Sequence, residues 1–113
     1  MLAYNENVGV ECVAFFKDAY GNASLPTTVY YRLDCGATGN TLVDWTFINP
    51  TSVVNSSGAT EVSALIEIPG TANAIQNKRN SREVKKLLVV ADKDLESEYS
   101  QEYQYLVRNI QGR

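Results

Sequence analysis

Apolar and polar side chains alternate along most of this chain, which is the pattern of β-strands with one buried face. In Val8–Phe16 every even-numbered residue is apolar, and Glu11 lies on the opposite face. Glu61–Ile68 alternates in the same way. Thr28–Cys35 and Leu42–Ile48 are rich in β-branched and aromatic residues, which favour strands. No segment has the i, i+3, i+4, i+7 apolar spacing of an amphipathic helix.

Three further strands are predicted in the remaining sequence. Thr51–Val54 is expected to form a short edge strand, and Tyr99–Ile110 alternates with its tyrosines on one face. Glu83–Ala91 has a continuous apolar run, so which of its side chains point inward stays open. Gly, Asn, Ser and Pro between the strands predict turns or loops at 17–26, 36–40, 55–59, 70–82 and 92–97.

Short strands separated by turns favour an all-β fold. We expect an antiparallel, immunoglobulin-like or fibronectin-III-like β-sandwich of about seven strands, with a small barrel as the alternative. Residues 1–113 match the size of a single domain, without an internal repeat or a linker. Segment 70–82 is the least strand-like part, and it predicts a mobile loop that can contain a helical turn.

Parity within the strands predicts which aromatic side chains are buried. Trp45 and Phe47 share one face of their strand, so we expect them, together with Tyr31, to fill the core between two sheets. Tyr30 has the opposite parity and is expected to point outward beside Arg32. Leu65 is also outward by parity, and an exposed tyrosine next to an exposed leucine is typical of a contact surface, although single exposed apolar residues are common too.

The composition excludes most kinds of catalysis. The chain has no histidine, so neither a Ser–His–Asp nor a Cys–His arrangement can exist, and no S-x-x-K motif is present. We therefore expect no enzyme and no cofactor. Cys12 and Cys35 both have inward parity; free thiols are expected, although a disulfide remains geometrically possible. Two cysteines without histidine cannot complete a zinc site.

The charges argue against nucleic acid as a partner. The net charge is −3 and the pI about 4.9, whereas nucleic-acid binders usually present a basic surface. Half of the ten basic residues lie within segment 78–86, but no aromatic residue is interleaved to stack on bases. This segment is either a contact for an acidic partner or a solvated loop that leads into a strand. In the second case the lysines of that strand prevent unwanted pairing with strands of other molecules.

An acidic segment, 92–102, complements the basic one. The two could meet between neighbouring copies in a ring or lattice, through a head-to-tail contact. Asp92 and Asp94 form a D-x-D that could contact calcium, but the glycine and glutamate of an EF-hand loop are missing. We interpret the segment as a solvated acidic turn, and we expect no metal.

The start of the chain has no basic segment followed by a long apolar one, so no secretory signal is predicted. No stretch approaches the roughly 20 apolar residues that span a membrane. These features predict a soluble protein made in a reducing cytosol, with no membrane partner.

The order of motifs resembles that of a known group of domains. An alternating first strand is followed by L-P-T-T-V-Y-Y-R-L-D, a glycine turn, L-V-D-W-T and a proline. V-x-x-x-I-x-I-P, A-N-A-I, R-E-V-K-K-L-L-V-V and Y-x-Y-x-V-x-N-I come next. This order is similar to the small immunoglobulin-like or fibronectin-III-like sandwich domains of tailed-bacteriophage virion proteins. Unlike in antibody domains, Cys12 and Cys35 both precede Trp45.

The resemblance implies a non-enzymatic structural protein of the virion, made in the host cytoplasm and located at the head–tail neck, on the tail or on the capsid as decoration. Its partners would be other virion proteins (capsid, portal or neck, tail) and its own copies. The alternative is a carbohydrate- or cell-surface-binding module. The residues expected to make contacts are outward by parity or lie in the charged loop: Tyr30, Arg32, Lys78, Arg79, Arg82 and Lys86.

Overall fold

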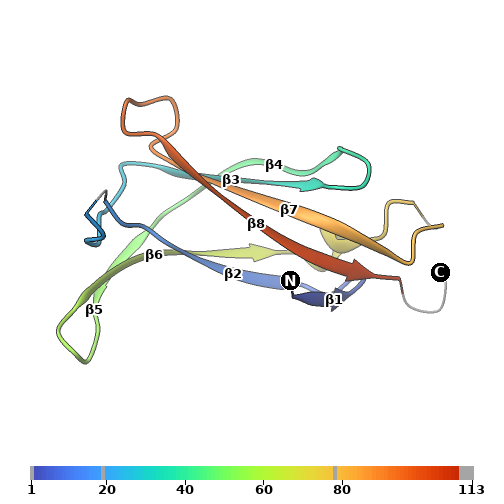
Figure 1. The fold of residues 1–113 in the computed structure, drawn as a ribbon, viewed down its shortest axis with the longest axis horizontal. Coiled ribbons are helices and arrows are strands. Elements are labelled where there is room, and N and C mark those ends of the chain that lie inside the picture. Colours follow the sequence, from blue (N-terminus) through green and yellow to red (C-terminus); the bar gives the residue numbers. More distant parts are fainter. Residues whose placement is uncertain (1, 19, 78, 110–113) are drawn as a thin grey trace.

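The computed structural model describes residues 2–18, 20–77 and 79–109, which form two β-sheets packed face to face (Figure 1). The five-stranded sheet has the order β1 (Ala3–Asn5), β8 (Tyr99–Arg108), β7 (Arg82–Ala91), β3 (Val29–Cys35), β4 (Thr41–Ile48). The three-stranded sheet has the order β2 (Val10–Phe15), β6 (Thr60–Ile68), β5 (Thr51–Val54). Among the described strands, all pairings are antiparallel except that of β1, which runs parallel to β8.

The predicted all-β fold with two packed sheets is confirmed, and the strands lie close to their predicted positions. The sequence does not predict β1, because three residues are too few to show alternation. Its parallel pairing corrects the expectation of a purely antiparallel fold. The predicted end of the last strand, Ile110, lies outside the described residues.

The core lies between the inner faces of the sheets and largely follows the predicted period of two. Along β6, Val62, Ala64, Ile66 and Ile68 are buried, and the residues between them are more exposed. They pack against apolar side chains of β3, β7 and β8 from the opposite sheet. Burying a large aliphatic side chain stabilises a fold by about 1.5–3 kcal/mol. Alternation is therefore the main determinant of this architecture.

The two cysteines also lie on inner faces, as predicted. Cys35 is fully buried in β3, and Cys12 in β2 is half-buried against the core. Both are free thiols, so the disulfide that the sequence left open is not formed.

Trp45 and Phe47 are not in the core, which corrects the prediction from parity. The pairing of β3 with β4 shifts between Tyr31↔Thr46 and Leu33↔Val43, so that β4 advances three residues where β3 advances two. This β-bulge inverts the parity of β4. Thr46 and Val43 therefore point towards the core, on the same side of the sheet as their partners in β3. Trp45 is half-buried and Phe47 is 50% exposed, both on the outer face.

Segment 70–82 contains the predicted helical turn, the 3-10 helix η1 (Gly70–Asn73). Its contacts argue against the predicted mobility. Asn73 is fully buried, donates to the carbonyl oxygen of Val8 at 2.8 Å and accepts from the hydroxyl of Tyr105 at 2.6 Å. Ile75 is also part of the core. The segment is thus fastened to residues 7–8, just before β2, and to β7 and β8.

Hydrogen exchange tests this anchoring. The backbone amides of Gln76 and Asn77 donate to the buried carboxylate of Glu83 at 2.7 and 2.9 Å. We expect these amides to exchange at least about tenfold more slowly than those of the exposed turn 55–58, because exchange requires the local structure to open. Equal rates in the two segments would restore the expectation of a mobile loop.

The molecule is elongated, with extents of 48 × 33 × 20 Å. Figure 1 places turn 36–40 and segment 70–81 at one end, and the β7–β8 turn at the other. The exposed acidic residues Asp94, Glu96 and Glu98 therefore lie at the opposite end of the β7–β8 hairpin from Arg79 and Arg82. Within one copy, these acidic and basic groups cannot meet.

Candidate functional site

The bulge in β4 creates a cluster of aromatic and basic side chains on the outer face of the five-stranded sheet. Tyr30 from β3 and Phe47 from β4 are cross-strand partners, and their rings meet edge to face with centroids 5.6 Å apart. Trp45 lies two residues before Phe47, next to Arg32 of β3 and Lys93 of the β7–β8 turn. These five residues are called the aromatic face below.

Two cations hold the indole of Trp45. The Cζ atom of Arg32 lies 4.9 Å and the Nζ atom of Lys93 5.2 Å from the ring centroid. Each such contact contributes about 0.5–1 kcal/mol at an exposed site. Arg32 also donates from Nη2 and Nε to Oδ2 of Asp34, at 3.0 and 3.2 Å, which fixes its guanidinium plane. The aromatic face is thus preorganised before any partner binds.

Two open hollows flank Trp45. One, of about 230 Å³, is lined by Tyr30, Thr28, Trp45, Lys93 and Asp94. The other, of about 310 Å³, lies between Trp45 and strands β7 and β8 and is lined in part by Val90 and Glu98. Ligand pockets usually span about 300–1,000 Å³ and enclose their ligand, whereas these hollows are open and lie below or at the lower limit of that range, so each suits one inserted side chain or one sugar ring.

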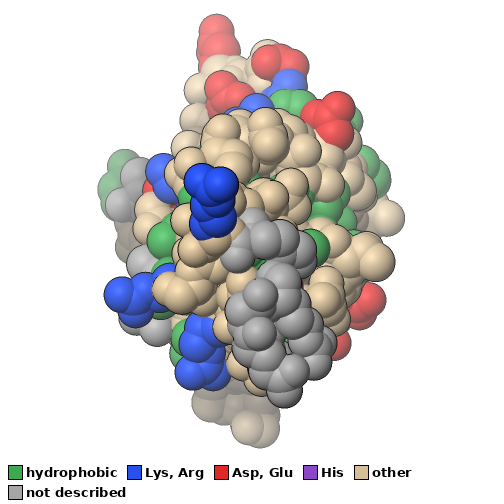
Figure 2. Space-filling view, turned by 90° about the vertical axis from the view of Figure 1, so that its right-hand side faces the viewer, with side chains coloured by type: hydrophobic (Ala, Val, Ile, Leu, Met, Phe, Trp, Pro, Cys, Tyr) green, Lys and Arg blue, Asp and Glu red, His purple; other side chains and the backbone are tan. Residues whose placement is uncertain are grey.

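The structure brings together three of the six predicted contact residues. Tyr30 and Arg32 are on the aromatic face, and Lys86 is exposed on the same side of the sheet, opposite Asp34 in the β3–β7 ladder. Arg79 and Arg82 are exposed. Figure 2 faces the end of the molecule where β7 begins, and Lys and Arg side chains are spread over that surface. Lys78 lies outside the described residues.

Lys85, which the sequence analysis groups with the basic contact segment, is instead completely buried. Its Nζ atom donates to the carbonyl oxygen of Ala74 at 3.0 Å and to Oε1 of Glu83 at 3.3 Å, and it lies 3.8 Å from Sγ of Cys35. Lys85 has the same parity as the core residues Leu87 and Val89. Because Lys85 lies next to other basic residues in the sequence, the pattern of charges predicted an exposed side chain instead.

Glu83 is the centre of this buried cluster. Its carboxylate accepts hydrogen bonds from the amides of Gln76 and Asn77, from Nδ2 of Asn80 at 2.9 Å and from Lys85. Burial alone would raise the pKa of Glu83, but these hydrogen bonds outweigh it and lower the pKa to about 2. The cluster therefore carries a paired charge and joins segment 74–80 to β7.

The low pKa of Glu83 predicts a loss of stability in acid. The folded pKa of about 2 lies below the ordinary value of 4.5, so the stabilisation is complete above about pH 4.5 and disappears as the pH falls towards 2. Hydrogen bonds from Ser97 and from the amides of Thr27 and Thr28 also lower the pKa of Asp92, which adds a change of the same sign. Denaturant titrations across this range measure the effect.

The Glu83→Gln variant isolates the contribution of Glu83, since glutamine cannot titrate. We expect its free energy of unfolding to vary less between about pH 5 and 2 than that of the unmodified protein. Parallel pH profiles for the two proteins would contradict the assignment.

The acidic turn is only partly solvated, which corrects the sequence interpretation. Asp92 is 9% exposed; its Oδ1 accepts from the amide of Thr27 at 2.6 Å, and its Oδ2 accepts from Oγ of Ser97 at 2.8 Å. It adopts φ = 53°, a left-handed conformation that aspartate tolerates better than most residues. Asp92 therefore fastens the β7–β8 turn to the start of β3, whereas Asp94 is solvent-exposed.

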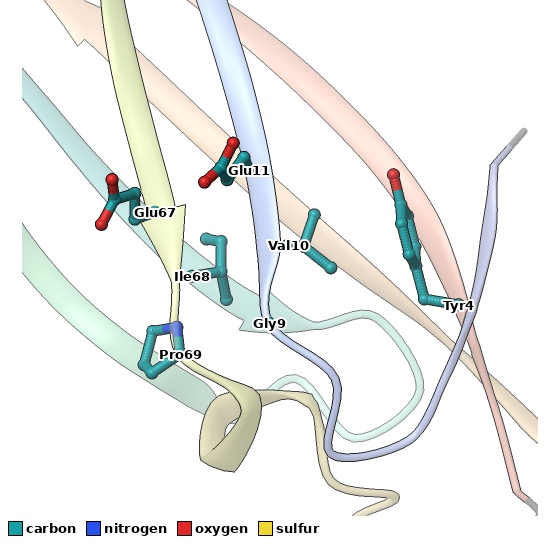
Figure 3. A pocket seen from close by; sticks show the side chains of 7 residues that line it. All are labelled: Tyr4, Gly9, Val10, Glu11, Glu67, Ile68 and Pro69. Carbon is teal, nitrogen blue, oxygen red and sulfur yellow. The ribbon is translucent and has the colours of Figure 1, made fainter.

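A wider hollow, of about 600 Å³, lies between β1 and the ends of β2 and β6 (Figure 3). Glu11 and Glu67 are direct cross-strand partners at its edge, and Tyr4 lies across from them. Two carboxylates alone are too few oxygen ligands for a cation. Within the described residues, no group of three or more acidic or cysteine side chains could hold a metal ion.

Comparison of the chain with protein-family models, with curated proteins and with solved structures gives no match. In the described part of the chain, no helix has the length and apolar character to cross a membrane.

Proposed function

We propose that this protein is a non-enzymatic structural component of a tailed-bacteriophage virion, which binds a neighbouring virion protein through its aromatic face. The observation that supports a contact role is this preorganised set of exposed aromatic and basic side chains. Trp, Tyr and Arg are the residues enriched among energetically dominant interface positions. The assignment to a virion comes from the sequence resemblance, and the aromatic face supplies a surface for it.

The strand order supports an immunoglobulin-like sandwich as the fold of this component. In immunoglobulin domains one sheet contains strands G, F and C, and variable-type domains add C′; B, E and D lie in the other sheet. The order β8-β7-β3-β4 corresponds to G-F-C-C′, and β2-β6-β5 corresponds to B-E-D. Such a sandwich leaves the outer face of the four-stranded array available for contacts.

The chemistry of the aromatic face suggests what its partner presents. Hollows beside Trp45 accept an apolar side chain, and the cations next to the ring are paired within the chain, Arg32 with Asp34 and Lys93 with Asp94. We therefore propose a partner surface with a protruding apolar residue surrounded by polar groups of both charges. Acidic and basic groups at opposite ends of the molecule additionally suit head-to-tail contacts between copies in a closed ring.

Copy number per particle tests the virion role. Mass spectrometry of purified virions would quantify this chain against the major capsid protein. A copy number comparable to that of the major capsid protein indicates capsid decoration. A copy number of about a dozen or fewer indicates the neck or tail, because closed rings of subunits contain such numbers of copies. Absence of the chain from virions would overturn the proposal.

Head-to-tail contact has its own test. Arg79 and Arg82 are exposed at the basic end, whereas Lys85 of the same segment is buried, so the charges to reverse are those of the two arginines. Replacing both with glutamate should abolish salt-sensitive self-association, whereas the same change at Lys86, on the face of the sheet, should leave it intact. Unchanged assembly at all salt concentrations would exclude the end-to-end contact.

One observation favours carbohydrate binding as a second function. Trp45 is half-buried on an outer face rather than in the core, and sugar-binding modules stack sugar rings on such side chains. Acrylamide quenching of this single tryptophan is expected under both functions, because the ring reaches solvent in either case. A saturable change in the fluorescence emission of Trp45 on adding glycans would indicate carbohydrate binding. If the emission does not change, protein contact remains the proposed function.

A further inference from the structure

We propose that Cys35 and Lys85 form an oxidative cross-link, a covalent Nζ–O–Sγ bridge between strands β3 and β7, with hydrogen peroxide as the oxidant. The two residues are direct partners in the β3–β7 ladder, and Nζ of Lys85 lies 3.8 Å from Sγ of Cys35. Both are completely buried. This modification site lies on the inner side of the sheet and does not depend on the proposed function.

The surrounding atoms hold the two reactive groups together. Oε1 of Glu83 accepts a hydrogen bond from Nζ of Lys85 at 3.3 Å and lies 3.8 Å from the thiol of Cys35. The carbonyl oxygen of Ala74 fixes Nζ from the other side at 3.0 Å. One oxygen atom has to be inserted between nitrogen and sulfur, and the flexible four-carbon stem of lysine permits the closer approach that the bridge needs.

The reaction balances with two molecules of peroxide and three of water. The first peroxide oxidises the Cys35 thiol to a sulfenic acid and leaves as water. Nζ of Lys85 releases one proton to water, and its electron pair then attacks the second peroxide, giving a hydroxylamine and water. The hydroxylamine oxygen attacks the sulfenic sulfur and expels the third water. Sulfur and nitrogen each lose two electrons, and one proton leaves to solvent, so the cluster changes from neutral to a single negative charge on the carboxylate of Glu83.

The two thiols differ in exposure and in neighbours, because Cys12 is half-buried whereas Cys35 is completely buried beside Nζ of Lys85. A surface hollow of about 360 Å³ is lined by Gly36, Asn80 and Glu83, so a small oxidant reaches the edge of the cluster. Cys12 lies on the three-stranded sheet, where its partner in the ladder is Ile66, whereas the ladder partner of Cys35 is Lys85. Cys12 is therefore an internal control.

The experiment treats the full chain with hydrogen peroxide and measures intact mass, then repeats the measurement after adding a thiol reductant. The expected product gains one oxygen and loses two hydrogens, and it reverts on reduction. Tryptic digestion should give a linked pair of peptides that contain Cys35 and Lys85, with cleavage after Lys85 lost. The Cys12→Ser variant should behave the same, while Cys35→Ser and Lys85→Met should not form the product.

Other products would overturn the proposal. A gain of oxygen on the Cys35 peptide without loss of hydrogen means that oxidation stops at sulfenic or sulfinic acid, and the peptide map separates this product from the sulfoxide of Met1. A loss of two hydrogens alone means a Cys12–Cys35 disulfide. If Lys85→Met fails to fold, the peptide map of the unmodified protein still decides, because the linked peptides are either present or absent.

Discussion

Replacing Glu83 with glutamine is expected to lower the free energy of unfolding by about 3–5 kcal/mol, as for other buried ion pairs that lose one partner. The ammonium of Lys85 would remain in a fully buried site without its counter-charge. The amides of Gln76 and Asn77 would lose a charged acceptor, which weakens the anchoring of segment 74–80. Denaturant unfolding monitored by the fluorescence of Trp45 measures the change.

Two variants control this experiment. Glu67→Gln removes an exposed carboxylate that lies opposite Glu11, so it should change stability by no more than about 0.5 kcal/mol. Combining Glu83→Gln with Lys85→Met should recover part of the loss, because the uncompensated charge is then removed. A loss below about 1 kcal/mol for Glu83→Gln would mean that water or another group compensates Lys85.

The burial of Glu83 and Lys85 could not be predicted from the sequence alone. Parity alone places both inward, with Leu87 and Val89, but charged residues are almost never fully buried unless they are paired. The partners that permit burial are separated in the sequence: Cys35 comes from β3, and the amides come from segment 74–80. The strand is therefore predictable from the sequence, while its buried ion pair depends on tertiary contacts.

The aromatic face was missed for a different reason. Alternation locates β4 correctly, but its pairing with β3 shifts register twice, and each shift inverts the inward and outward positions that follow it. One local sign existed, since the adjacent residues Leu42 and Val43 both pack against the core, which strict alternation does not allow. Tyr30 and Arg32, on the regular strand β3, were predicted as outward neighbours, and the structure confirms that position.

Replacing Trp45 with alanine is expected to weaken partner binding by about 2–4 kcal/mol, or roughly 30-fold to 1,000-fold. The change removes the ring held by Arg32 and Lys93 and merges the two hollows that it separates. Because Trp45 is only half-buried, the fold should lose far less stability than it would from an equivalent change in the core.

The measurement is the number of copies of each variant incorporated per virion when the unmodified chain competes. Leu65→Ala is the matched control, because Leu65 is 46% exposed on the outer face of the other sheet. Trp45→Phe should incorporate to an intermediate level, since it keeps an aromatic ring but loses area and the indole. If Trp45→Ala competes as well as Leu65→Ala, the contact surface lies elsewhere, and the exposed side chains of the three-stranded sheet become the next ones to test.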